Sequence, residues 1–297
     1  MGGRRPDLEL LRGAIDMHAH TAPALFPRPI RDQDLARYAL EYNMRGFVLK
    51  DHDSATFHRA NNLKASMPGL DPIGAIVLNR SVGGINPYVV EAALHYGAKV
   101  IWMPSNHSKH HDDYFGIPDY PQLGRERPLL PGPGVTILDE NGQLTSDAKT
   151  IVRLVHEAGA CLCTGHLHLD ETRLLLDEAN RVGLERFVVT HVNWALTKYD
   201  LDVQRELVGK GAYLEIVAIS CVSPTFYEQT PAELAPWLDA HKGEHLILSS
   251  DLGQGSGPPH PEGLRMLAYS LLAEGVDYST LERMMKENPA FLVGLAS

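Results

Sequence analysis

The sequence predicts an α/β protein, a single-domain (β/α)8 or TIM barrel that spans residues 1–297, and three observations lead to this fold. Strand-like and helix-like stretches alternate almost without interruption along the chain. Eight strand candidates can be counted, each followed by a helix candidate, which is the repeat of this barrel. The length of 297 residues also fits one domain, because such a barrel takes roughly 250 residues.

The strand candidates are short apolar segments. Several, such as Phe187-Val-Val189 and Leu246-Ile-Leu248, are continuous apolar runs, as expected for parallel strands that are buried on both faces. A doubly wound open sheet is the alternative, but the glycine-rich loop typical of it does not follow the first strand, where Thr21-Ala-Pro-Ala24 stands instead. The eight strands are expected at residues 14–20, 46–52, 71–79, 98–106, 160–167, 186–192, 212–219 and 245–251.

Helix signals fill the intervals between these strands. They consist of apolar residues at helical spacing, a capping residue or proline at the start, and glycine at the end. Two sequences of the form Ser/Thr-x-x-Glu, at Thr230–Glu233 and Ser279–Glu282, predict capping boxes. The other clear helix candidates lie at residues 34–42, 86–97, 146–159 and 170–183.

One connection is far longer than strand–helix loops usually are. About forty residues separate the fourth strand from the helix that begins at Ser146. This insertion, residues 107–145, holds the histidine cluster His107-Ser-Lys-His-His111 and a proline-rich stretch at 118–133. Because it leaves the C-terminal end of a barrel strand, we expect either a lid or specificity loop over the active-site mouth, or a surface or subunit-contact insertion.

Composition excludes several classes of function. The net charge is −10 and no basic stripe is present, so nucleic acid is not an expected partner. No segment approaches the roughly 20 apolar residues of a membrane span, and the N-terminus does not resemble a signal peptide. The 3 cysteines form no disulfide framework, which favours a cytoplasmic protein. A homodimer is the default expectation for the assembly.

Metal-capable side chains stand at the ends of several strand candidates. His18 and His20 are two residues apart in a strand, so both imidazoles point to one side and can bind one ion. Any single one of these residues could be a hydrogen-bonded core side chain. Together they indicate a site for a divalent ion, most simply Zn, with Mn, Fe or Ni as alternatives. The expected ligands are His18, His20, Lys50, His166, His191 and Asp251.

The pattern resembles the amidohydrolase superfamily of metal-dependent hydrolases, which have TIM-barrel folds. Their signature is His-x-His on the first strand, His on the fifth, His on the sixth and Asp on the eighth. The segment Asn288-Pro-Ala290 near the C-terminus also resembles one that is common in the superfamily. The resemblance spans the chain and implies one or two divalent ions, but no particular substrate. The matching positions are His18, His20, His166, His191 and Asp251.

One feature departs from that family. Binuclear members usually carry a carboxylated lysine on the fourth strand, which has no lysine here, whereas Lys50 lies within the second strand. A carboxylated Lys50 could bridge two metals, or Lys50 could form a salt bridge to Asp251 or to substrate. A third alternative is that His52 is a ligand, because Lys50-Asp-His-Asp53 is similar to the second motif of the PHP phosphoesterases. We expect a binuclear site, with a mononuclear one as the alternative.

The expected activity is hydrolysis of an amide, cyclic amide, lactone or other ester, in an anionic small molecule, by metal-activated water. Asp251 is the expected catalytic base. Glu215, in an apolar strand, needs a partner such as Lys50 or a substrate amine. Hydrolysis of a phosphoester or phosphotriester and mononuclear non-oxidative decarboxylation are the alternatives; a non-catalytic binding protein would leave Asp251 without a role. The expected substrate-binding residues are His52, Arg80, His107, Lys198 and Tyr227.

Overall fold

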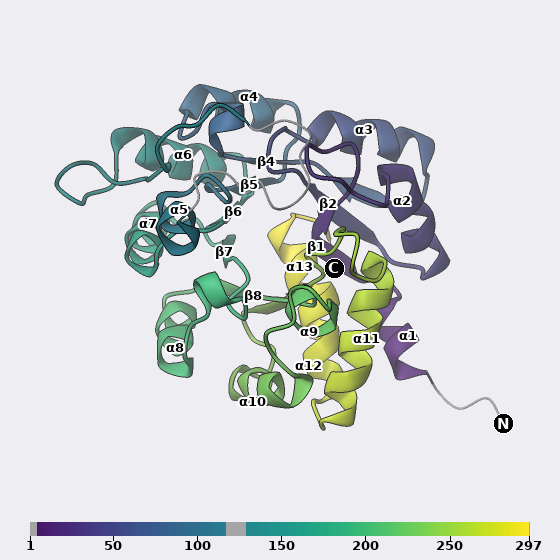
Figure 1. Cartoon of the computed structure of the whole chain (residues 1–297). Helices are drawn as coiled ribbons and strands as arrows, with labels where there is room; N and C mark the ends of the chain where they lie inside the picture. The colour runs from purple at the N-terminus through teal and green to yellow at the C-terminus, as the bar shows by residue number, and fades with distance from the viewer. Residues whose placement is uncertain (1–4, 117–128, 297) are drawn as a thin grey trace.

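The computed structural model describes residues 5–116 and 129–296, and within them parallel strands are surrounded by helices (Figure 1). One sheet has the order β1-β2-β3 and the other the order β4-β5-β6-β7-β8-β9, and all paired strands are parallel. The predicted α/β class is therefore confirmed. The strands are β1 (Ile15–His20), β2 (Gly46–Lys50), β3 (Asp71–Ile73), β4 (Ala75–Val77), β5 (Val100–Trp102), β6 (Cys161–Cys163), β7 (Phe187–Val189), β8 (Tyr213–Val217) and β9 (Leu246–Ser249).

The third expected strand is divided in two at Gly74. A Cβ at this position would lie 2.3 Å from the Cα of Phe57, so only glycine allows the close approach of the two backbones. Thr56 bridges the division, because its Oγ1 donates to the carbonyl of Leu49 at 2.7 Å and accepts from the N–H of Ala75 at 2.9 Å. Each of the eight expected strands is found at its expected place, although the observed strands are shorter.

The segment that follows β9 is hydrogen-bonded to β1. The N–H of Asp251 donates to the carbonyl of His18 at 2.8 Å, and the N–H of His20 donates to the carbonyl of Leu252 at 3.0 Å. The C-terminal ends of strands β1 and β9 are thereby held side by side. This matters for the site because the predicted ligands lie at these ends.

Helices cover the strands on their outer side. Both faces of the strands are buried: in β5, Val100 and Trp102 belong to one apolar cluster, whereas Ile101 between them belongs to another. The helices are α1 (Pro6–Leu11), α2 (Asp32–Glu41), α3 (Phe57–Ser66), α4 (Pro87–His95), α5 (Lys109–Phe115), α6 (Ser146–Glu157), α7 (Leu169–Val182), α8 (Leu201–Gly209), α9 (Ile219–Val222), α10 (Pro231–His241), α11 (His260–Ala273), α12 (Tyr278–Glu282) and α13 (Asn288–Leu292).

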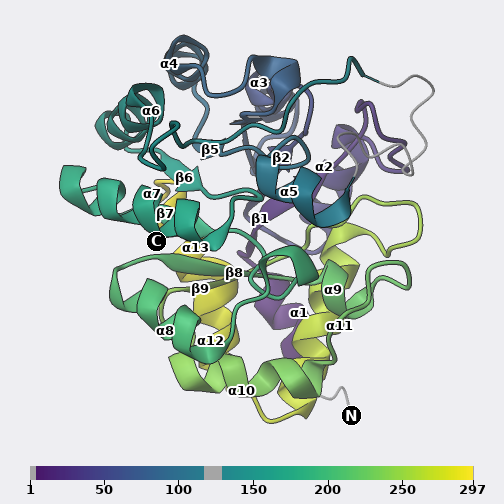
Figure 2. The same ribbon diagram turned by 60° about the vertical axis from the view of Figure 1, so that its left-hand side comes forward.

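The capping boxes have different outcomes. The box at Thr230 is confirmed: its side chain accepts a hydrogen bond from the N–H of Glu233, whose carboxylate accepts from the N–H of Thr230. The prediction of a capping box at Ser279 is wrong, because α12 already begins at Tyr278 and Asp277 occupies the cap position. The first helix, α1, lies beside α11 in both views (Figures 1 and 2).

The insertion at 107–145 is described only outside residues 117–128, so most of its proline-rich stretch lies outside the described residues. Its first part forms α5, which ends at Gly116 in a left-handed conformation. None of the described helices is long and apolar enough to cross a membrane.

Candidate metal centre

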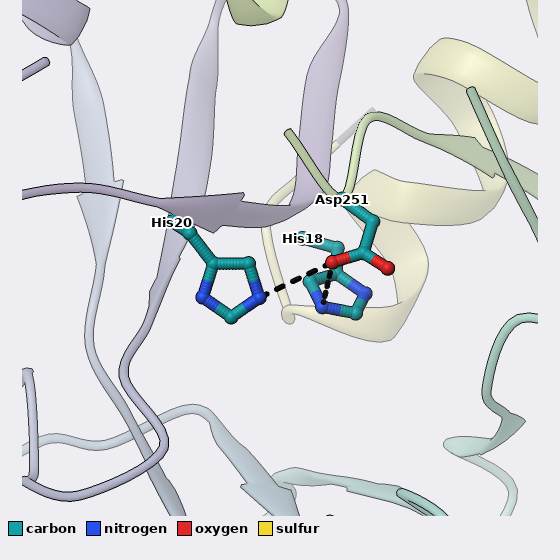
Figure 3. Close-up of side chains that lie close together, drawn as sticks. All are labelled: His18, His20 and Asp251. Carbon is teal, nitrogen blue, oxygen red and sulfur yellow. Dashed lines mark ion pairs between the residues drawn. The ribbon is translucent and has the colours of Figure 1, made fainter. Parts of the chain in front are cut away.

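Three predicted ligands converge where β1 meets the end of β9 (Figure 3). Nε2 of His18 lies 3.0 Å from Oδ1 of Asp251, and Nε2 of His20 lies 3.2 Å from the same oxygen. Both imidazoles are buried. One ligand atom from each of the three residues lies within 4.8 Å of the others, which is close enough for a single ion to bind all three.

Local backbone features place these side chains. The pairing of β1 with β2 shifts register between Asp16 and Ala19, so the strand is irregular at His18, as is common next to functional sites. Asp251 has a φ of 50°, a left-handed conformation that Asp and Asn adopt more readily than most residues. At Gly253 an added Cβ would lie 2.0 Å from the carbonyl oxygen of His20, so glycine is required where this segment passes β1.

Hydrogen bonds at Nδ1 orient both imidazoles. Nδ1 of His18 lies 3.2 Å from the carboxylate of Glu215, and Nδ1 of His20 lies 3.0 Å from the carbonyl oxygen of Lys50. Because a carboxylate and a carbonyl only accept, Nδ1 of each imidazole donates, which leaves Nε2 as the nitrogen that could bind an ion together with Asp251. Imidazoles that bind metals are usually held in this way by their second nitrogen.

The partner of Glu215 differs from the one expected from the sequence. The partner of this carboxylate is His18, together with the backbone N–H of His191 at 3.1 Å, rather than Lys50 or a substrate amine. Burial raises the pKa of Glu215, but His18 outweighs that effect and the resulting pKa is below the ordinary value. The side chain is therefore a fixed negative charge behind the imidazole of His18.

His166 and His191 form a second pair, with ring centroids 4.9 Å apart. The hydroxyl of Thr197 donates to the carbonyl of His191 at 2.9 Å, so its oxygen accepts from Nδ1 of the same residue at 2.8 Å. Nδ1 of His166 lies 2.9 Å from Nδ1 of His111, which α5 contributes. Burial lowers the pKa of His191 to about 3 and that of His166 well below 6.5, so both are neutral imidazoles suited to bind a metal.

Lys50 contacts one histidine of the first pair. Its Nζ is 2.9 Å from Nε2 of His18 and 5.0 Å from the ring centroid of Trp102, and the side chain is buried. Burial lowers the pKa of this amine. No ion pair joins Lys50 to Asp251 in the described part of the chain, although their charges interact.

Most of these groups line one cavity with about 550 Å³ of empty space, part of it open to solvent. Its lining includes the polar residues His20, Lys50 and Asp251 and three apolar side chains, Trp194, Ile219 and Phe226. The remaining lining residues are Arg28, His52, Asn106, His111, His166, His191 and Gln254.

Of the five predicted substrate-binding residues, one lines this cavity and four do not. His52 lines the cavity and bonds through Nδ1 to Oγ of Ser105 at 2.9 Å. The other four do not line it. Arg80 donates to the carbonyl of Pro133 at 3.0 Å, His107 is buried, Lys198 is exposed, and Tyr227 lines a separate pocket beside Cys221.

Sequence reasoning missed Arg28, Asn106 and Trp194 as lining residues. Arg28 lies in the loop after β1, and loops after strands commonly build such sites, but Arg80 also follows a strand, so this position alone did not single out Arg28. Trp194 and Asn106 likewise follow β7 and β5. Nothing in the residue pattern distinguishes them from other loop residues.

The donor set fits a divalent ion. Oriented imidazoles, of which His20, His166 and His191 have lowered pKa values, and an ionised carboxylate are ligands that Zn, Mn, Fe and Ni accept. Burial raises the pKa of Asp251, but His18 and hydrogen bonds from both histidines outweigh this and hold the pKa well below 3.8. The carboxylate is thus ionised and available as a ligand.

Comparisons with known proteins identify the family and support the fold. A family model described as a family of unknown function, DUF6282, matches residues 13–215. No curated protein matches the sequence. Among solved structures, similarity extends over nearly whole chains at low identity, and the matches are structures of the amidohydrolase superfamily. The resemblance of the fold to that superfamily is thereby confirmed.

Three of these structures illustrate the match. The probable dipeptidase PvdM from Pseudomonas aeruginosa has a TM-score of 0.67 at 10% identity, covering 97% of this chain and 96% of that one. An amidohydrolase from Pseudomonas aeruginosa has a TM-score of 0.62 at 11% identity, with 98% of each chain covered. A lactonase from Listeria monocytogenes has a TM-score of 0.59 at 12% identity, with 98% and 97% covered.

Proposed function

This chain belongs to the DUF6282 family, and from the geometry of its site we propose that it is a metal-dependent hydrolase. The bond cleaved by activated water is that of an amide, cyclic amide, lactone or other ester in an anionic small molecule. One observation carries the proposal: Nε2 of His18 and Nε2 of His20 both face Oδ1 of Asp251, at 3.0 and 3.2 Å. Such a cluster is costly to bury unless a cation or proton compensates the carboxylate.

Two ions can be assigned to residues. His18, His20 and Asp251 would hold one ion, and His166 and His191 would hold a second. The Lys50 amine, 2.9 Å from Nε2 of His18, would supply a further ligand shared by the two ions if it were carboxylated. A divalent ion held here, Zn in the first place and Mn, Fe or Ni as alternatives, would lower the pKa of a bound water to about 7 and would polarise the bond under attack.

The remaining chemistry belongs to the protein's own side chains. Asp251 is ionised and has a second carboxylate oxygen, so it accepts the proton of the attacking water and returns it to the leaving group. Glu215 fixes the tautomer of His18, and its negative charge would compensate the positive charge of an ion bound by that imidazole. Trp194, Ile219 and Phe226 exclude water from the apolar part of the substrate.

The fold supports the same proposal. We infer that the bonds between β1 and the segment after β9 close the strands into the (β/α)8 barrel, with the site at its C-terminal mouth. The insertion 107–145 then reaches that mouth, because His111 on α5 contacts His166. This contact favours a lid or specificity loop over a remote surface insertion.

A second candidate, mononuclear non-oxidative decarboxylation, is favoured by one observation. Among the described residues, the compact group of ligand atoms contains only His18, His20 and Asp251, which is a ligand set for one ion. A single ion with an unmodified lysine beside it would suit that reaction.

The test combines metal analysis with an activity screen. Purified protein is analysed for metal per chain, stripped with a chelator, and reloaded with Zn, Mn, Fe or Ni one at a time. Each form is assayed on amides, cyclic amides, lactones, phosphoesters and aromatic carboxylates. Chelator-sensitive hydrolysis supports the proposal. Release of CO2 by a one-ion protein would favour the second candidate, and full activity without metal would exclude both.

A further inference from the structure

A cationic side chain that the proposed mechanism does not use lines the same cavity. Arg28 lies in the loop between β1 and α2, and Nε of its guanidinium is buried with no hydrogen-bond partner among the described residues. It also forms no ion pair in the described part of the chain. An arginine in a partly closed cavity without a partner is costly, since a buried cation ordinarily needs an acceptor.

Two of the neighbouring carboxylates contact other side chains. Asp51 accepts from Arg59 at 3.1 Å, and Asp251 contacts both histidines of the metal cluster. Burial lowers the pKa of Arg28 to about 10, while Asp251, Asp51 and Asp53 oppose that decrease. The guanidinium is therefore charged at neutral pH and interacts with these acids only at a distance.

The loop that carries Arg28 is held firmly at its base. The N–H of Ala22 donates to the carbonyl of Ile30 at 2.8 Å, and Thr21 donates to Asp32 at 2.6 Å. Arg59 links the two sides, with contacts of 2.7 Å to Asp32 and 3.0 Å to the carbonyl of Pro23. These contacts hold the two ends of the loop together and so restrict where its central residues, including Arg28, can lie.

Phe26 supports the guanidinium from one side. Its ring centroid lies 5.7 Å from Cζ of Arg28, and its ring packs edge-to-face with that of His52, with centroids 5.6 Å apart. An aromatic ring behind an arginine limits its movement and leaves the donor edge free for a planar anion.

From these observations we propose that Arg28 is the specificity-determining residue for the substrate's carboxylate, which it binds through two parallel hydrogen bonds. The substrate then carries a carboxylate at one end, an apolar group against Trp194, Ile219 and Phe226, and the reacting bond over the metal cluster. The reacting position in this picture rests on the proposed function; the carboxylate subsite does not. Arg28 takes the place that the sequence had suggested for Arg80 and Lys198.

Binding of two matched probes tests the subsite without any turnover. Phenylacetate and phenylacetamide have the same shape, and only the first is an anion. Their dissociation constants are measured by titration calorimetry on Zn-loaded wild type, Arg28→Gln, Arg28→Lys and Arg31→Gln. Arg31 is an exposed arginine of the same loop, so its variant is a matched control for the loss of one positive charge.

We expect Arg28→Gln to weaken phenylacetate binding at least 10-fold, with Arg28→Lys intermediate and Arg31→Gln unchanged. Phenylacetamide should bind all four proteins equally. Equal phenylacetate binding by wild type and Arg28→Gln would overturn the subsite. So would binding that disappears when the metal is removed but is insensitive to Arg28, because the carboxylate would then be a metal ligand.

Two controls keep the outcomes separate. Melting temperatures show whether Arg28→Gln remains folded, and if it does not, Arg28→Lys alone decides, because it keeps the charge and loses the paired hydrogen bonds. If the hydrolysis screen fails while phenylacetate binding still depends on Arg28, the subsite stands and the proposed function falls. If hydrolysis is found but phenylacetate binding does not depend on Arg28, only the subsite is overturned.

Discussion

The carboxylate of Glu215 lies 3.2 Å from Nδ1 of His18, although 197 residues separate them in the chain. Glu215 is on β8 and His18 is on β1, so the contact exists only when the strands are assembled. Both side chains are buried, and Glu215 also accepts from the N–H of His191 at 3.1 Å. One carboxylate thus contacts a member of each histidine pair.

Glu215→Gln should weaken metal binding. The amide cannot supply the negative charge that stabilises a metal-bound imidazole, and loss of such an orienting partner typically costs roughly 10–100-fold in metal affinity. The measurement is a competition titration of the purified protein against a chelator with known Zn affinity.

Glu274→Gln is the matched control, because Glu274 is an exposed glutamate on the surface. It should bind Zn as the wild type does. If Glu215→Gln also keeps wild-type affinity, the contact with His18 contributes to folding and not to the metal centre.

Asp251→Asn should abolish turnover and leave the protein folded and metal-bound. Asparagine tolerates the φ of 50° at this position, so the backbone is not strained by the change. Loss of a general base typically lowers kcat by roughly 10²–10⁴-fold. Turnover is measured on the substrate found in the screen, and metal content by elemental analysis.

Asp239→Asn, on the exposed end of α10, controls for the removal of one charge and should retain full activity. Full activity of Asp251→Asn would remove Asp251 as the base and leave it, at most, as a metal ligand.

The sequence predicted the fold because its signals are local. Apolar strands and capped helices recur in regular order, and every expected strand is present. It did not predict the division at Gly74, since that depends on the approach of Phe57 from α3. It also misplaced the start of α12, because both Asp277 and Ser279 are residues that commonly begin helices.

The convergence of His18, His20 and Asp251 was predictable from the sequence, whereas the residues that line the cavity beside them were not. His18, His20 and Asp251 come from strand ends, where direction is set by the strand itself. Arg80 and Lys198 come from loops, and their reach depends on contacts such as that of Arg80 with Pro133. The sequence alone therefore does not show which of the loop arginines lines the cavity.

Lys50→Ala should reduce the metal content from two ions per chain to one. Its amine lies 2.9 Å from Nε2 of His18 and is buried at the centre of the site, so a carboxylated lysine there would hold both ions together. Acetate or propionate should partly restore the second ion and the activity by filling the space of the missing carbamate. Elemental analysis with and without the added acid provides the measurement.

Lys99→Ala, at an exposed lysine, is the control and should keep the wild-type ion count. Two ions per chain in Lys50→Ala would argue against the bridge. One ion per chain in both the wild type and Lys50→Ala would instead agree with the mononuclear alternative.

Asp7→Asn should lower stability in a pH-dependent way. Oδ2 of Asp7 lies 2.8 Å from Arg5 and 2.8 Å from Arg265, which joins α1 to α11, and the side chain is 1% exposed. Hydrogen bonds from Arg5 and then Arg265 lower the pKa of Asp7 to about 2. Because the folded pKa is below the unfolded one, this contribution is complete above about pH 4 and is lost as the pH falls toward 2.

The expected loss at pH 7 is about 1–2 kcal/mol, reduced from the full shift because Arg5 is largely exposed. Urea unfolding of wild type and Asp7→Asn, compared between pH 7 and pH 2.5, provides the measurement, and the difference should shrink at the lower pH. Asp202→Asn, which removes an exposed pair with Arg205, should cost less than about 0.5 kcal/mol at either pH. A difference for Asp7→Asn that stays constant with pH would show that packing, and not the ion pairs, connects α1 to α11.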